Sequence, residues 1–146
     1  MTEQQYIIEL QNALQVQRKS VIDNLNFVLT RIPEITKKIC IDIFLPQDID
    51  GSFTVRISLE GPDLYVLNKQ IDDIANIFDI KRTAEGFVPY IPLIEDVEFD
   101  AYKIICSCII HWLKSIWTEI KHQHILIPVD LVIADDYGEF PVVKLK

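Results

Sequence analysis

The longest run of helical periodicity in this chain lies at its N-terminus. Thr2 and Gln5 have the spacing of a capping box, in which each side chain bonds the backbone N–H of the other residue. Apolar residues then recur at mostly helical spacing, at Ile7, Leu10, Leu14, Val21, Leu25, Val28 and Ile32. Pro33 disfavours helical geometry in the residue before it. The pattern therefore predicts a long amphipathic helix over about residues 3–31.

A second helical segment, over about residues 99–121, is apolar around most of its circumference. One stripe comprises Phe99, Tyr102, Cys106, Ile109, Leu113, Ile116 and Ile120. Ile105, Cys108 and Trp112 lie on other faces of the same turns. Such a helix must be covered from more than one side, by the rest of the fold or by a second copy. We therefore expect a homodimer, the commonest symmetric assembly, and we expect the acidic run at residues 95–100 to cap this helix.

Three hairpins and one shorter helix complete the pattern. Residues 39–45 and 53–59 are rich in β-branched and aromatic side chains and predict a hairpin, with turn residues between them. A shorter helix is expected over about residues 64–79, and small hairpin arms at residues 80–83 and 87–91. Residues 125–133 and 140–145 predict a last hairpin. The fold class is α+β: one domain, residues 1–146, with an antiparallel sheet of about four to six strands packed against both long helices.

The charge balance restricts the classes of partner. The chain has 22 acidic against 14 basic residues, a net charge of −8, which disfavours nucleic acid because phosphate must be neutralised by cations. A basic protein partner suits this charge, although acidity also serves solubility alone. The N-terminus lacks signal-peptide features and the apolar runs are too short to span a bilayer. With three cysteines in no disulfide-framework spacing, we expect a cytoplasmic protein without membrane association.

No motif in the sequence indicates a particular chemistry. Cys106, Cys108 and His111 resemble zinc ligands in type, but residues two apart point to opposite sides of a helix, so we expect packed thiols. Asp48 and Asp50 precede a glycine that comes too early for a calcium loop. Phosphate-binding loops and nucleophile elbows are absent from the sequence. We accordingly predict no catalytic residues, no cofactor and no metal.

The most suggestive polar segment is residues 135–140, in which carboxylates alternate with aromatic rings. Asp135, Asp136 and Glu139 could pair with basic groups of a partner, and Tyr137 could supply an anchoring ring. The alternative is a hairpin turn in which Asp and Gly serve only backbone geometry. We take these four residues as the predicted partner-binding set.

Two classes of function follow from these observations. The first is a non-enzymatic interaction module that binds a basic protein, for which small acidic bacterial immunity proteins are an analogy in size and composition only. The second is a small enzyme with a carboxylate or histidine site, which no catalytic spacing supports. An assembly role as a homo-oligomer is a further alternative that the sequence does not separate from the first.

Overall fold

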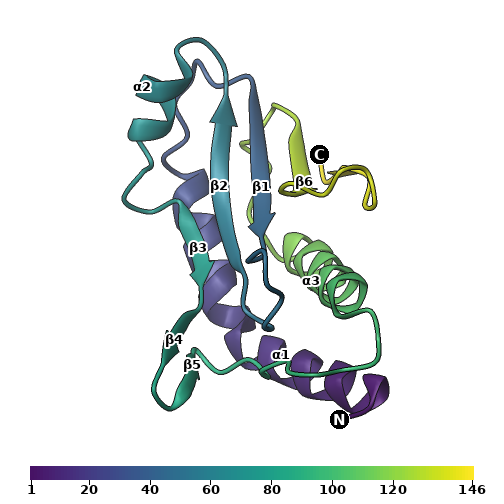
Figure 1. Ribbon diagram of the computed structural model, residues 1–146. Helices are drawn as coiled ribbons and strands as arrows, with labels where there is room; N and C mark the ends of the chain where they lie inside the picture. The colour runs from purple at the N-terminus through teal and green to yellow at the C-terminus, as the bar shows by residue number, and fades with distance from the viewer.

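The computed structural model describes residues 1–146 as a two-layer α+β fold with a mixed five-stranded sheet. Figure 1 views the sheet from its uncovered side, with α1 crossing behind the strands and α3 beside them. One hydrophobic core contains residues from both long helices and from the sheet. None of the three helices has the length and hydrophobicity needed to cross a membrane. The predicted α+β class is confirmed.

The N-terminal helix is a single unbroken element, α1 (Glu3–Leu29). Its capping box forms as the spacing predicted, since the Gln5 N–H donates to Thr2 Oγ1 at 3.1 Å and the Thr2 N–H to Gln5 Oε1 at 2.8 Å. Five of the seven predicted stripe residues are buried, with Leu10 and Val21 fully covered, whereas Ile7 is half-buried and Ile32 lies beyond the end of the helix. Burial of this stripe is the main force that holds so long a helix on the sheet.

The first predicted hairpin is present as β1 (Lys38–Phe44) and β2 (Thr54–Glu60), with Ile41 opposite Ile57. The expectation of a wholly antiparallel sheet is wrong, because β6 (Val129–Ile133) pairs parallel to β1. The chain between β2 and β6 crosses the sheet, so that β6 starts at the same end of the sheet as β1. β7 (Val143–Lys144) pairs antiparallel to β6 and confirms the last hairpin in a shorter form. The strand order is β3-β2-β1-β6-β7.

The helix expected over residues 64–79 is wrong in its second half. α2 (Leu64–Lys69) stops early, and β3 (Asn76–Asp79) adds an antiparallel strand to the edge of β2. Phe78 packs against Phe53 with ring centroids 5.1 Å apart. Pairing satisfies the backbone groups of β2 that would otherwise remain open along this edge. The small hairpin is present as β4 (Lys81–Thr83) and β5 (Gly86–Val88).

The apolar helix is α3 (Ala101–Trp117), and its burial is achieved within one chain. Its buried residues are Ile105, Cys106, Ile109, Trp112, Leu113, Ile116 and Trp117. α1 packs along α3, and both helices contribute to the core beneath the sheet. The observation that led us to expect a homodimer is thus explained by intramolecular packing, and the homodimer stays a prediction.

Candidate protein-binding surface

Three loops meet at one end of the sheet. Because β1 and β6 run parallel, both strands end at the same end of the sheet. The loops that follow them, residues 45–53 and 134–140, therefore leave the sheet there. The third loop, residues 92–100, leads into α3 and is tied to the first because the Ile94 N–H donates to the Asp50 carbonyl oxygen at 2.9 Å. Tertiary structure therefore brings together three segments that are about 40 residues apart in the sequence.

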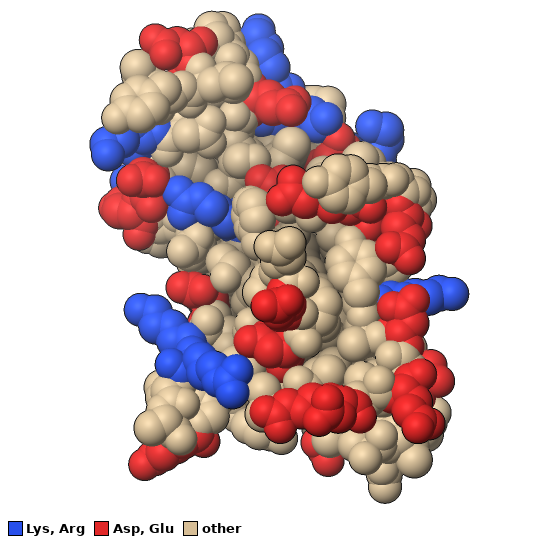
Figure 2. All heavy atoms as spheres, in the orientation of Figure 1, with Lys and Arg blue, Asp and Glu red and all other residues tan.

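These three loops contain nine carboxylates and no lysine or arginine, and we call them together the acidic end. Its acidic residues are Asp48, Asp50, Glu95, Asp96, Glu98, Asp100, Asp135, Asp136 and Glu139. The other 13 of the 22 acidic residues are balanced by the 14 lysines and arginines elsewhere. The net charge of −8 thus arises at this end of the molecule. Figure 2 shows carboxylates across the lower middle and along the right side of the face seen, with one basic side chain protruding among them at the right edge.

The carboxylates of the acidic end have almost no cations beside them. Asp50 is the exception, with Arg82 Nη1 3.9 Å from its carboxylate. On the uncovered face of the sheet the opposite holds, since Asp130 lies 2.6 Å from Lys38 Nζ and 3.6 Å from Lys144 Nζ. Unpaired charges of one sign add their potentials, so the field of this protein is strongest at the acidic end.

The predicted partner-binding residues divide into one inward and three outward side chains. Asp136 points inward and accepts hydrogen bonds from the Tyr102 hydroxyl and the Phe140 N–H. Burial, and after it the hydrogen bond to Asp136, raises the pKa of the Tyr102 phenol, so Tyr102 stays a donor. Asp136 therefore fixes the loop to the start of α3. Tyr137 is 98% exposed, and Asp135 and Glu139 are also exposed.

The backbone of this loop holds Tyr137 away from the core. Asp135 and Tyr137 have φ values of 56° and 55°, in the left-handed region that is unfavourable for most residues. Such conformations persist where the surrounding structure fixes them and are common in binding loops. Aspartate tolerates this region well, but tyrosine does not, so the exposed ring is presented at an energetic cost.

A hollow of about 510 Å³ lies beside Tyr137, between the loop after β1 and the loop after β6. Tyr102 and Tyr137 provide aromatic walls, Leu45 and Ile49 provide apolar contact, and Asp135 contributes a carboxylate. Aromatic rings next to a carboxylate are a favourable environment for the stem and head of a lysine or arginine side chain.

Gly51 allows two of the loops to approach each other closely, a role that no sequence pattern indicated. Its φ is +102°, and a Cβ atom at this position would lie 2.4 Å from the Pro92 carbonyl oxygen. No side chain fits there, so glycine is required both for conformation and for space. The turn residues at Asp50 and Gly51 predicted a turn but not its contact with the distant Pro92.

None of the residues Cys106, Cys108 and His111, which resemble zinc ligands in type, lines the hollow beside Tyr137. Cys106 is fully buried beside Tyr102, whereas Cys108 and His111 line a groove between α1 and α3. Cys106 is thus on a different side of α3 from Cys108 and His111, as helical spacing predicted. Burial raises the pKa of Cys106 to about 12 and that of Cys40 to about 11, so both are neutral thiols near pH 7.

The expectation that the acidic run at residues 95–100 caps α3 holds for one residue. Only Asp100 caps the helix, where it accepts the Lys103 N–H at 3.1 Å. The other carboxylates of the run are free to contribute to the acidic end.

The comparison with protein families is decisive for classification. A model described as a family of unknown function, DUF6389, matches residues 1–146. The chain belongs to this family. No curated protein and no solved structure matches the chain significantly. Any functional statement must therefore come from the surfaces described above.

Proposed function

We propose that this protein is a non-catalytic interaction module whose acidic end binds a basic protein. The observation that carries the proposal is the concentration of nine carboxylates in three converging loops that contain no basic residue. Cys40 and Cys106 are buried, and the three loops contain no acid–base pair, so neither feature supports catalysis.

In this proposal, long-range charge and short-range contact act at different stages of binding. The field of the acidic end attracts a cationic partner and raises the association rate, an effect that salt screens over about 8 Å at physiological ionic strength. Asp135 and Glu139 act at this stage, since they are exposed and unpaired. Tyr137 then covers a partner side chain seated in the neighbouring hollow, which slows dissociation. Asp136 holds the loop in shape.

The test uses three forms of the protein as immobilised bait in lysate of the native host at low salt. One is unmodified and one carries Asp48→Asn, Asp135→Asn and Glu139→Gln in the acidic end. We expect the unmodified bait to retain basic proteins that elute as salt rises, and the acidic-end variant to lose them. With the partner purified, the triple variant should associate about threefold to tenfold more slowly.

The matched control carries Glu34→Gln, Asp63→Asn and Glu85→Gln, which remove the same charge from exposed positions outside the acidic end. This control should retain the partner. Its dissociation rate should equal that of the unmodified protein, and its association rate should be only slightly lower. Tyr137→Ala should mainly accelerate dissociation. Equal losses in the two triple variants would show that net charge alone matters, and retention by both would reject the acidic end as the binding surface.

A homodimer is the second candidate, and the exposed apolar side chains of α2 are what favour it. Leu64, Tyr65 and Val66 are 57%, 77% and 52% exposed, and Ile35, 54% exposed, belongs to the segment that packs against Gly61 just before this helix. Apolar side chains gathered in one place commonly mark an interface. Light scattering at micromolar concentration should give twice the chain mass, and Tyr65→Lys should return it to the monomer mass.

The three unpaired cysteines favour a cytoplasmic location within either proposal.

A further inference from the structure

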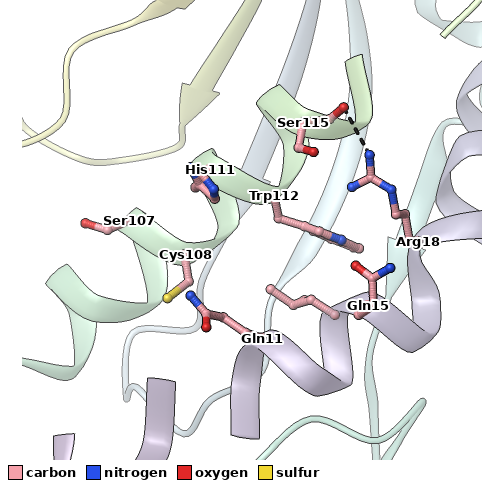
Figure 3. A pocket seen from close by; sticks show the side chains of 9 residues that line it. Gln11, Gln15, Arg18, Ser107, Cys108, His111, Trp112 and Ser115 are labelled. Carbon is pink, nitrogen blue, oxygen red and sulfur yellow. Dashed lines mark hydrogen bonds between the residues drawn. The ribbon is translucent and has the colours of Figure 1, made fainter. Parts of the chain in front are cut away.

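A groove between α1 and α3 lies away from the loops of the acidic end. Its volume is about 360 Å³, within the range of sites for small organic molecules. Nine residues line it, four from α1 and five from α3. Figure 3 shows the Trp112 ring reaching from α3 toward α1, with Gln11, Gln15 and Arg18 along the opposite wall.

The floor of the groove contains a buried donor without an acceptor. Trp112 is 6% exposed, and its Nε1–H is buried with no hydrogen-bond partner. The ring itself is well packed, edge-on to Phe78 at 5.5 Å between centroids. Buried polar groups in folded proteins are almost always bonded, so an unused donor next to a cavity points to a missing acceptor. Figure 3 shows the indole nitrogen on the side of Gln15 and Arg18.

The polar groups around Trp112 are also largely unused. Gln11 and Gln15 are exposed, and their side-chain amides make no hydrogen bond within the fold. Arg18 donates from Nε and Nη2 to Glu119 and from Nη2 to the Ser115 carbonyl oxygen at 3.2 Å, which leaves Nη1 available. The lining thus presents several donors above an apolar floor.

The charge of the lining narrows the chemistry of a ligand. Although the chain has 22 acidic residues, none of them lines this groove. Because no carboxylate lines this cavity, it does not repel an anion at close range, and a neutral or singly anionic molecule can bind there. Leu14 and the face of Trp112 supply apolar area for a planar ring.

We propose that the groove between α1 and α3 binds a small planar organic molecule through an sp² oxygen, carbonyl or carboxylate, that accepts the Trp112 Nε1–H. The oxygen also lies within reach of Arg18, and the ring occupies the space above Leu14. Gln15 turns aside to admit the ligand, since its side chain is exposed and unbonded. This site is independent of the acidic end and of any protein partner.

The test follows the two indole N–H signals of the ¹⁵N-labelled protein, since the chain has two tryptophans. Trp112→Phe assigns the signals and retains an aromatic ring against Phe78. The probes are benzoate and benzamide, which share a ring and an sp² oxygen, and benzylammonium, which has the ring without an acceptor. Benzoate or benzamide should shift the Trp112 signal saturably, with a dissociation constant on the order of 1 mM.

Three controls make the result specific. The signal of Trp117, which stacks on His122 with centroids 4.6 Å apart, should not move. Benzylammonium should leave the Trp112 signal in place. Gln11→Phe, which places a ring in the groove from an exposed position, should weaken binding about tenfold, with an unchanged circular dichroism spectrum as the check on folding.

Two results would overturn the proposal. The first is the absence of a saturable Trp112 shift with both acceptor probes at about 20 mM, which would indicate that water alone meets the indole donor. The second is equal binding of benzylammonium, or equal binding to Gln11→Phe, which would show a nonspecific apolar contact. Failure here would leave the acidic end untouched, because the two sites share no residue.

Discussion

Replacement of Gly51 by alanine tests whether the loops of the acidic end converge as described. The new Cβ would meet the Pro92 carbonyl oxygen at 2.4 Å, where an ordinary contact needs about 1 Å more. Backbone on both sides must move, which costs about 1–3 kcal/mol. A positive φ in an alanine adds about 1–2 kcal/mol. Gly51→Ala should therefore reduce the free energy of unfolding by about 2–5 kcal/mol.

Gly86→Ala is the matched control. Gly86 has a similar φ of +118°, but a Cβ there would meet no atom within 4 Å. It should cost only the conformational part, about 1–2 kcal/mol. The loss of unfolded-state entropy is common to both substitutions and cancels in the comparison. The difference of about 1–3 kcal/mol isolates the contact between the loops.

Urea denaturation followed by tryptophan fluorescence gives both free energies. Hydrogen exchange at Ile94 provides a local measurement, because its N–H donates to the Asp50 carbonyl oxygen across the same contact. The Ile94 amide should exchange faster in Gly51→Ala and at the native rate in Gly86→Ala. Equal denaturation midpoints for the two variants, with Ile94 still protected in both, would refute the convergence of the loops.

Three further predictions follow from packing and ionisation. Leu113→Ala should lower the free energy of unfolding by about 2–5 kcal/mol in urea denaturation, since Leu113 is buried in α3. Burial raises the pKa of the Asp42 carboxyl, so ionisation of this group destabilises the fold increasingly as pH rises from about 4 through the folded-state pKa. Asp42→Asn should therefore raise the melting temperature at pH 7 but not at pH 3. Under native conditions iodoacetamide should modify Cys108 first, then Cys40, and Cys106 only on unfolding, as mass spectrometry of timed samples would show.

The elements that the sequence determined by itself are those specified by local pattern. α1 needs only its capping box and apolar stripe, and the β1–β2 hairpin needs only alternation and a turn. The apolar circumference of α3 predicted its burial correctly. It did not determine what covers the helix, because the same pattern suits intramolecular and intermolecular packing equally.

Tertiary structure decided the features that depend on distant partners. Residues 76–79 have a spacing compatible with a helix, yet they form β3 because the edge of β2 offers hydrogen bonds that no local periodicity records. The parallel pairing of β1 with β6 places the loops after them at one edge, which creates the acidic end from separate runs of carboxylates. Asp136 and Trp112 also depend on tertiary packing. The position of α3 brings the Tyr102 hydroxyl to the Asp136 carboxylate, and it buries the Trp112 Nε1–H without an acceptor.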